Sequence, residues 1–580
     1  EEHAPEAFEM LKQHAALMRV RLRAEMQVEF VISDGELFIL DGVRVSRSSR
    51  AAVRIAVALA DEGIIPREEA LMRVQPRTLT ELLHRQVDPR VKRDVIGRGI
   101  AASPGAATGK IVFNANDAQA SAARGEKCIL VRRETSPEDI RGMHAAQAVL
   151  TERGGITSHA AVIGRGMGLP CVVGASSMRF DLVKGLITAS DGRMFKAGDE
   201  ITLDGTSGEV LCGAADMLEP LLDATFQKLM SWAKDAADIG IRANADTPAD
   251  AQTARNFDAQ GIGLCRTEHM FFDPSRLTVM REMIFADTSE GRRAVLERLL
   301  PMQREDFIQL FRIMQGQPVC IRLFDPPLHE FLPTSRTGQR DLAEALDLPL
   351  SDVTRRIEAM TEYNPMLGLR GVRLGVTVPE IYEMQARAIF EATIEASCDG
   401  EPVVPEIMIP LVSAKREVEL IKASVDKIAM AVKSERGATF TYRLGVMVET
   451  PRAALRAGEI SPHCSFLSFG TNDLTQMTYG LSRDDAGRFM STYVQQGVFP
   501  EDPFHMLDRD GVGELLQLGA ARGRAAQPGI TLSICGEHGG NPESIDFCRA
   551  AGFDYVSCSP FRVPVARLAA AQLAIADKIK

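Results

Sequence analysis

A histidine follows a pair of glycines in the segment TERGGITSHAAVIG. Gly154 and Gly155 permit a tight turn at this point of the chain. Either Thr157 or Ser158 can then cap a helix whose first turn contains His159. Free backbone N–H groups and the helix dipole stabilise added negative charge there, which suits an imidazole that receives a phosphoryl group. The spacing alone agrees equally with a capped helix that carries an incidental histidine.

Polar or charged residues follow most of the apolar runs in the C-terminal half. Eight runs alternate with amphipathic helices over residues 239–540: IGIRANAD, GIGLCRTE, VCIRLFDP, MLGLRGVRL, EIMIPLV, YRLGVMVET, FLSFGTND and LSICGEHGG. Eight such βα units predict a TIM barrel. A further run, FDYVSCSP, is either a ninth strand or the replacement for a weak one. Because the C-terminal ends of barrel strands share one rim, we expect these residues to converge: Arg266, Arg322, Arg370 or Arg373, Glu449, Asn472 with Asp473, and Cys535.

Two long stretches resemble the signatures of the phosphoenolpyruvate-utilising enzymes. TSHAAVIGRGMGLPCVVG is similar to their phosphohistidine signature, whereas VMVETPRAAL, FLSFGTNDLTQMTYGLSRDD and SICGEHGG are similar to catalytic segments of their C-terminal barrel. Within the family, GTNDLTQMT and CGEHGG resemble the pyruvate, phosphate dikinase form more than phosphoenolpyruvate synthase or Enzyme I of the sugar phosphotransferase system. The resemblance runs from about residue 50 to the end. It implies an α/β multidomain fold in which a swivelling β/β/α phosphohistidine domain precedes a C-terminal TIM (β/α)8 barrel.

The resemblance also implies a role for each matching residue. His159 is the implied phosphoryl carrier, through its Nε2 atom. Glu449 and Asp473 are the implied Mg²⁺ ligands at the substrate site, and hard carboxylate oxygens suit that ion. Arg266 and Arg322 would clamp the phosphoryl group, for which a planar guanidinium is better shaped than an ammonium group.

Asn472 and a third arginine complete the implied substrate site. Asn472 would hold the pyruvate moiety, and Arg370 would supply a further cation. Arg373 is close in sequence, so one of these two arginines could merely neutralise barrel carboxylates. The alternative to a metal-binding role for Glu449 and Asp473 is likewise structural, namely ion pairs with nearby arginines.

Cys535 is the implied general acid, at the end of the predicted eighth strand. Transfer of the phosphoryl group leaves an enolate whose methylene carbon must be protonated, and a thiol can supply that proton. An isolated cysteine in an apolar run is otherwise an inert core thiol, which is our interpretation of most of the other nine. Glu537 and His538 could orient the cysteine loop, although His538 could equally be a capping residue.

The threonine two residues before His159 has a regulatory interpretation. In the dikinase form the matching threonine is an off switch when phosphorylated, because a dianion there repels the incoming phosphate. The resemblance therefore implies a regulatory kinase that acts on Thr157. A helix cap explains this threonine equally well.

Changes in composition and in the expected secondary structure divide the chain into four parts. Residues 1–95 resemble a remnant of a nucleotide-binding domain plus a helical linker, and glycine-rich turns with short strands fill 96–213, the expected swivelling domain. Residues 214–234 form a helical linker, and 235–580 form the barrel that would bind phosphoenolpyruvate and pyruvate. The connectors near 90–98 and 213–230 could serve as hinges.

Composition excludes several other classes of protein. The 580 residues carry 67 basic and 78 acidic side chains, a net charge of -11, which predicts no general attraction to nucleic acid or to an anionic membrane. The ten cysteines form no CxxC pair, so we expect reduced thiols and neither disulfides nor a zinc site. No apolar stretch reaches the roughly 18 to 20 residues of a membrane helix. Together with the absence of a signal pattern, this predicts a cytoplasmic protein.

The nucleotide-binding domain of the related enzymes, of the ATP-grasp type, is largely missing from the sequence. MQVEFVISDGELFILDGVRVSRSS resembles its last hairpin, in which Glu29 matches an acid that contacts ATP and metal. Asp41 and Val43 stand where the dikinase form has glutamine and arginine, so the ATP half-reaction is doubtful for this chain. Because the first residue is Glu and not Met, we expect a fragment or a processed form.

Two functions from different classes are compatible with these residues. The first is a phosphotransferase of the pyruvate, phosphate dikinase type, which interconverts phosphoenolpyruvate and pyruvate through a phosphohistidine. The second is an Enzyme I-like carrier that passes phosphate to a separate partner protein. A non-catalytic binding module is disfavoured, because the implied catalytic residues are all present. The resemblance further implies Mg²⁺ as cofactor, a homodimer, and ATP and phosphate as substrates only if an upstream domain exists.

Overall fold

The computed structural model describes residues 5–45, 49–136, 139–155, 158–220, 222–398, 400–486 and 489–579. The chain divides into two compact units. The first unit consists of Glu1–Arg85, Leu218–Asp238 and Pro564–Lys580, and the second of Gln86–Met217 and Ile239–Val563. Among the described residues, no helix has both the length and the apolar character that crossing a membrane requires.

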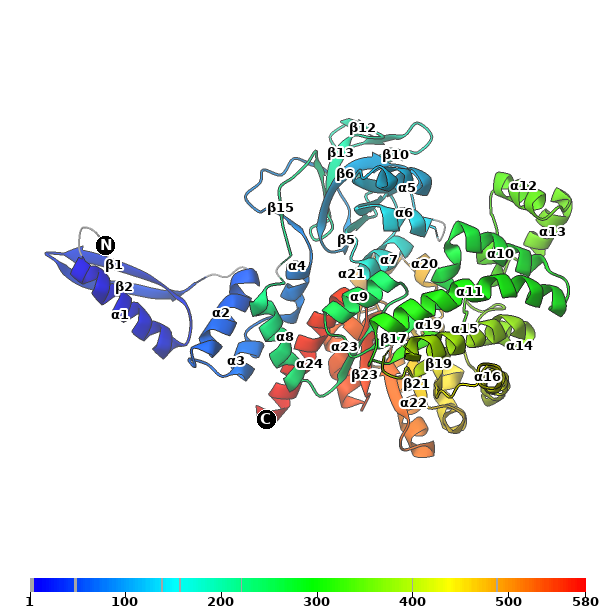
Figure 1. Cartoon of the computed structure of the whole chain (residues 1–580). Coiled ribbons are helices and arrows are strands. Elements are labelled where there is room, and N and C mark those ends of the chain that lie inside the picture. Colours follow the sequence, from blue (N-terminus) through cyan, green and yellow to red (C-terminus); the bar gives the residue numbers. More distant parts are fainter. Residues whose placement is uncertain are drawn as a thin grey trace. The chain divides into compact units, whose positions relative to one another are not determined.

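The first unit combines a β-hairpin with helices (Figure 1). Strands β1 (Met26–Ser33) and β2 (Glu36–Arg44) pair antiparallel and form a hairpin in the segment that resembles one in sequence. Asp34 and Gly35 both have positive φ angles, 52° and 85°, which matches the right-handed twist of a two-residue hairpin turn. The helices of this unit are α1 (Pro5–Leu22), α2 (Ser49–Asp61), α3 (Arg67–Met72), α4 (Leu79–Leu83), α8 (Ala224–Ala236) and most of α24 (Val563–Ile579).

An eight-stranded mixed sheet forms part of the second unit. Its order is β4-β14-β13-β6-β7-β8-β9-β5, with β6 to β9 parallel and the other neighbours antiparallel. We call residues 95–212, which hold this sheet, the sheet module. The strands are β4 (Val95–Arg98), β5 (Ile100–Ser103), β6 (Ala106–Val112), β7 (Cys128–Arg132), β8 (Ala148–Thr151), β9 (Cys171–Val173), β13 (Glu200–Asp204) and β14 (Glu209–Cys212).

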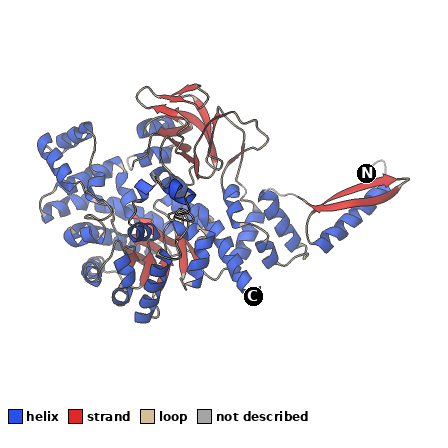
Figure 2. Ribbon diagram, turned by 180° about the vertical axis from the view of Figure 1, so that it is seen from behind, coloured by secondary structure: helices blue, strands red, loops and turns tan. Residues whose placement is uncertain are grey.

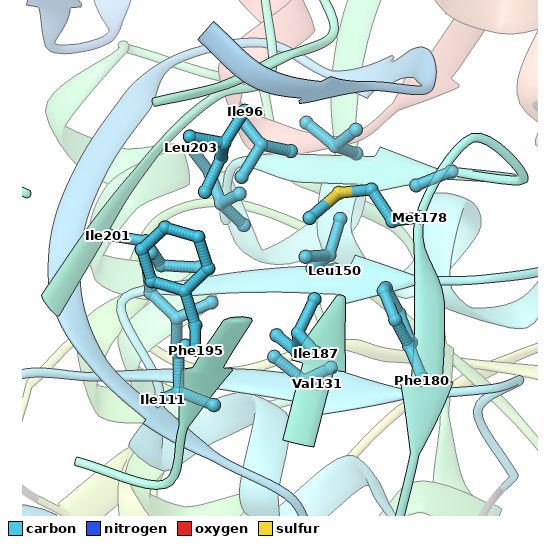
Figure 3. Close-up of a cluster of buried hydrophobic side chains, with 14 of the residues drawn as sticks. Ile96, Ile111, Val131, Leu150, Met178, Phe180, Ile187, Phe195, Ile201 and Leu203 are labelled. Atoms are coloured by element: carbon cyan, nitrogen blue, oxygen red, sulfur yellow. The ribbon is translucent and has the colours of Figure 1, made fainter. Parts of the chain in front are cut away.

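Both faces of this sheet are buried, which explains the continuous apolar run of β7. Ile129 and Val131 contribute to one hydrophobic cluster, and Cys128 and Leu130 contribute to another. Figure 3 shows the first cluster, in which side chains of the small sheet β10 (Arg179–Asp181), β11 (Leu186–Thr188) and β12 (Met194–Lys196) meet those of the large sheet. The second cluster includes residues of α5 (Ala115–Ala123), α6 (Ile140–Ala145) and α7 (His159–Met167).

Eight parallel strands close into a barrel, as the sequence predicts. Figure 2 shows its strands surrounded by helices. The strands are β16 (Gly240–Asn244), β17 (Ile262–Arg266), β18 (Val319–Arg322), β19 (Pro405–Ile409), β20 (Arg443–Val448), β21 (Phe466–Phe469), β22 (Thr531–Ile534) and β23 (Tyr555–Cys558). The main helices are α9 (Pro248–Asn256), α10 (Pro274–Phe285), α11 (Ser289–Ile313), α12 (Arg336–Ala345), α13 (Leu350–Met360), α15 (Pro379–Cys398), α16 (Lys415–Arg436), α19 (Thr471–Tyr479), α22 (Val512–Ala526) and α23 (Pro542–Ala550).

One predicted strand is wrong. MLGLRGVRL forms a turn and the short helix α14 (Val372–Thr377), and the strand that closes the barrel against β16 is β23, from FDYVSCSP. At Gly371 the chain has a φ of 57°, and a Cβ atom there would lie 2.7 Å from the Cβ of Leu411. This close approach in a left-handed conformation requires glycine and interrupts any strand. Cys535 therefore follows the seventh strand of the barrel instead of the eighth.

A buried ion-pair layer lies near the N-terminal ends of the barrel strands. Glu406 on β19 accepts hydrogen bonds from Arg242 Nη1 at 2.6 Å and from Arg443 Nη1 at 2.5 Å. Arg443 also donates to Thr531 Oγ1 at 2.8 Å, and the Arg242 guanidinium lies 3.9 Å from the centre of the Tyr555 ring. One carboxylate thus compensates two arginines inside the barrel, at the opposite end from the predicted site.

Replacing Glu406 with alanine is expected to lower the free energy of unfolding by about 3 to 5 kcal/mol, because two arginines lose their buried counter-ion. Urea unfolding of the purified chain measures this change. The matched control is Glu459→Ala, which breaks the exposed pair with Arg456 and should cost about 0 to 1 kcal/mol. Equal effects of the two substitutions would contradict the structural role given to the buried layer.

Candidate functional site

Six of the predicted site residues lie at the C-terminal ends of the barrel strands or shortly beyond them. Arg266 ends β17, Arg322 ends β18, and Glu449 directly follows β20. Asn472 and Asp473 lie in the first turn of α19, and Cys535 directly follows β22. These residues thus lie on one rim of the barrel although up to 269 positions separate them in sequence, the difference between 266 and 535.

Three carboxylates meet at this rim. Oxygen atoms of Asp325, Glu449 and Asp473 all lie within 4.8 Å of one another. Asp325 and Glu449 are buried, and the Glu449 carboxylate accepts a hydrogen bond from the backbone N–H of Leu411 at 2.6 Å. The sequence predicted Glu449 and Asp473 but missed Asp325. The available signal was its place in VCIRLFDP, three residues after Arg322, which ends the strand.

Two arginines compensate this carboxylate cluster. Arg322 Nη1 lies 3.1 Å from Asp325 Oδ2, and its Nη2 donates to Glu268. Arg370 Nη2 donates to Asp325 Oδ2 at 2.6 Å and to Asp473 Oδ2 at 3.5 Å. Arg373, the alternative to Arg370 in the sequence, instead donates to the carbonyls of Leu367 and Gly368, at 2.9 and 2.8 Å. Arg370 therefore belongs to the cluster, and Arg373 holds the backbone of its own loop.

The donor set of the cluster fits a hard divalent cation. All three groups offer carboxylate oxygens, and Asp325 Oδ1 is buried without a hydrogen-bond partner among the described residues. Burial raises the pKa of Glu449 well above its usual value, and the charges of Asp473 and Asp325 raise it further. A cation bound here would offset the repulsion between the carboxylates and would give Asp325 Oδ1 a partner.

The Cys535 thiol is buried in the barrel interior. Its Sγ donates to the carbonyl of Phe469 at 3.7 Å, and its side chain packs in a cluster with Leu264, Cys320, Met408, Met447 and Phe466. Burial raises the pKa of Cys535 to about 11. The thiol is therefore protonated at neutral pH and can donate a proton. All ten cysteines are free thiols in the structure.

The loop after β22 links Cys535 to Asn472 through backbone and side-chain hydrogen bonds. The N–H of Glu537 donates to Asn472 Oδ1 at 3.1 Å. His538 Nε2 lies 2.9 Å from the carbonyl of Pro503, so it carries the proton, and Nδ1 accepts from the Thr471 hydroxyl at 2.8 Å. Burial lowers the pKa of His538 to about 4, which keeps the ring neutral. Both residues thus fix the loop, in agreement with the orienting role considered from sequence.

The predicted histidine begins a helix of the sheet module. Helix α7 starts at His159, and Ser158 is its N-cap residue with extended backbone angles. Thr157, the proposed regulatory position, lies outside the described residues. Six residues into the helix, Arg165 Nε lies 3.6 Å from the carboxylate of Glu537, which also pairs with Arg562 at 3.6 Å. Burial opposes ionisation of Glu537, but these arginines lower its pKa to about 2. An ion pair therefore joins α7 to the loop that follows β22.

Comparisons with known proteins agree with this arrangement. The chain matches the profile of the PEP-utilising enzyme, PEP-binding domain over residues 222–575, and that of the PEP-utilising enzyme, mobile domain over residues 124–208. The first match alone covers more than half of the chain.

Several curated relatives carry the name pyruvate, phosphate dikinase. The protein of Rhizobium meliloti is 53% identical over 572 residues, and the alignment covers 98% of this chain and 64% of the relative. The protein of Clostridium symbiosum is 45% identical, with 100% and 66% coverage, and the chloroplastic protein 1 of Oryza sativa is 48% identical, with 99% and 61% coverage. The chain thus spans somewhat less than two thirds of the length of these relatives. It belongs to the family of PEP-utilising enzymes, with both the mobile and the PEP-binding domain of that family.

Proposed function

We propose that this chain is a phosphotransferase of the pyruvate, phosphate dikinase type, which interconverts phosphoenolpyruvate and pyruvate through a phosphohistidine at His159. The observation that carries the proposal is the barrel rim, where arginines, three carboxylates and a protonated thiol meet. The names of the relatives support the dikinase type.

The substrate would bind at this rim with its two charged ends held by different residues. Arg266, Arg322 and Arg370 would neutralise the phosphoryl group, and Asn472 would hold the pyruvate moiety. Glu449 and Asp473 would hold Mg²⁺, with Asp325 as a further oxygen donor. When bound, the ion would act as a Lewis acid that polarises the oxygens of the substrate.

The proposed step transfers a phosphoryl group and a proton. The P–O bond of the enol ester breaks while an N–P bond forms at Nε2 of His159. The electron pair of the broken bond remains on the resulting enolate. Its C3 carbon then takes the proton of the Cys535 thiol, which gives pyruvate, and the thiolate is reprotonated from solvent. The high pKa of Cys535 makes the thiol available for this step.

The domain assignment is part of the proposal. Residues 96–213 would be the swivelling phosphohistidine domain and residues 235–580 the phosphoenolpyruvate- and pyruvate-binding domain. Residues 214–234 would link them, and residues 1–95 would be the remnant of a nucleotide-binding domain with its helical linker. Cytoplasmic location, a homodimer and control by a kinase at Thr157 complete the proposal. ATP and phosphate would take part only with an upstream domain, and Asp41 and Val43 make that half-reaction doubtful.

The second candidate is an Enzyme I-like carrier, and one experiment tests both functions. The purified chain is incubated with Mg²⁺ and phosphoenolpyruvate that carries a labelled phosphoryl group, and pyruvate release is followed together with protein-bound label. Labelled chain is then offered either AMP with pyrophosphate, for reversal of the dikinase reaction, or candidate carrier proteins. Transfer to a carrier alone would favour the second function. Failure of the chain to take up any label would exclude both.

A further inference from the structure

Asp246 is a further carboxylate of the rim. It lies outside the carboxylate cluster of Asp325, Glu449 and Asp473 and contacts three groups at once. Asp246 follows β16, and its Oδ1 accepts the backbone N–H of Arg266 at 2.6 Å. Its Oδ2 lies 3.2 Å from Arg266 Nη1 and 2.9 Å from His269 Nδ1. A carboxylate only accepts hydrogen bonds, so His269 Nδ1 carries its proton. Asp246 therefore binds both the backbone and the guanidinium of Arg266.

The guanidinium of Arg266 depends on this contact more than Arg322 depends on any one partner. Within the part of the chain that the structure describes, the Asp246 carboxylate is the single side chain that forms a hydrogen bond or an ion pair with Arg266. Arg322, in contrast, contacts two carboxylates, Glu268 and Asp325. Removal of Asp246 would thus leave the Arg266 side chain free to adopt other rotamers, whereas Arg322 would keep one carboxylate partner after the loss of either Glu268 or Asp325.

The position of Asp246 is itself fixed by neighbouring groups. Its backbone N–H donates to Asp250 Oδ2 at 3.4 Å, and the same Asp250 forms a capping box with Thr247 at the start of α9. The side chain of Asp246 is only 13% exposed. Asp250 of the helix cap therefore holds Asp246, and Asp246 in turn holds Arg266.

We propose that Asp246, with His269, is a positioning residue that holds the Arg266 guanidinium in the orientation required to bind the phosphoryl group of the substrate. The proposal rests on the proposed function, because that function gives Arg266 its role. Asp246 touches no substrate in this account and acts through Arg266. His269 in turn fixes Oδ2 of Asp246 by its Nδ1–H donor.

The chemistry of the three contacts determines which substitutions are informative. The Asp246→Asn side chain is neutral and has a single acceptor oxygen. When that oxygen accepts a hydrogen bond from the backbone N–H of Arg266, the NH₂ group faces Arg266 Nη1, so that two donors oppose each other. Asparagine at position 269 retains a donor close to that of Nδ1, whereas leucine removes it. Asp246→Asn and His269→Leu should therefore weaken substrate binding, and His269→Asn should largely restore it.

The test measures binding of phosphoenolpyruvate with Mg²⁺ by calorimetry, together with single-turnover loading of the chain. For Asp246→Asn we expect Kd to rise about tenfold to a hundredfold, the effect of losing a hydrogen bond to a charged group. The rate at saturating substrate should fall by less. The matched control is Asp306→Asn, a partly buried aspartate paired with Arg276 on the outer helices, which should leave Kd unchanged.

A double-mutant cycle separates positioning from a general structural effect. If Asp246 acts through Arg266, then Asp246→Asn should raise Kd no further in a chain that already carries Arg266→Met. Additive effects, or a wild-type Kd for Asp246→Asn alone, would overturn the proposal. Failure of the wild-type chain to bind phosphoenolpyruvate would instead overturn the proposed function, so the two failures are distinguishable.

Discussion

Replacing Cys535 with alanine is expected to slow the formation of pyruvate from phosphoenolpyruvate by about a hundredfold to ten-thousandfold, the usual contribution of a positioned general acid. The thiol is buried, and its pKa of about 11 keeps it protonated at neutral pH. Rapid-quench measurement of pyruvate in a single turnover gives the rate directly.

A second cysteine of the barrel provides the control for this substitution. Cys320 on β18 is also buried and belongs to the same hydrophobic cluster as Cys535. Cys320→Ala removes a thiol of the same size from the same cluster, so it reports the cost of lost packing alone. Equal losses of rate in the two variants would show that Cys535 contributes only to packing.

Replacing Glu449 with glutamine is expected to abolish tight binding of Mg²⁺ and to reduce loading of the chain by about a hundredfold or more. A metal ion contributes several kcal/mol to a transition state of this kind, and each 1.4 kcal/mol is about a factor of ten in rate. Calorimetric titration with Mg²⁺ reports the lost site independently of activity. Unchanged affinity for Mg²⁺ would contradict the assignment of Glu449 as a ligand.

The same substitution should leave the fold intact. Burial and the two neighbouring carboxylates already disfavour the charge of Glu449, so a neutral amide should keep or raise the melting temperature. The amide oxygen can still accept the N–H of Leu411. Glu380→Gln is the control, because Glu380 is a buried carboxylate paired with Arg292 that lies outside the rim. It should leave binding of Mg²⁺ unchanged.

The barrel could be predicted from sequence because its strands are short apolar runs that alternate with amphipathic helices. The error at MLGLRGVRL shows the limit of that signal. Its apolar residues alternate with Gly368 and Gly371 in a strand-like pattern, but they surround a left-handed turn whose necessity depends on contact with Leu411, 40 residues away. Such a contact is a property of the folded chain and leaves no local pattern.

The site was predictable where a residue lies in a recognisable segment at a strand end, as Glu449 and Cys535 do. Asp325 and Asp246 were missed for the same physical reason. Each lies two or three residues beyond its strand, and its importance arises from arginines and carboxylates contributed by other segments of the chain. The distinction between Arg370 and Arg373 also required the fold, because only the direction of each side chain separates them.

Transfer of the phosphoryl group to His159 is the measurement that most directly tests the account. The wild-type chain is incubated with Mg²⁺ and labelled phosphoenolpyruvate, and the labelled protein is treated with acid or base before the label is counted. We predict close to one equivalent of label per chain that is lost in acid, survives in base, and is absent from His159→Ala. Label that survives acid, or label that persists in His159→Ala, would contradict the central claim that this histidine carries the phosphoryl group.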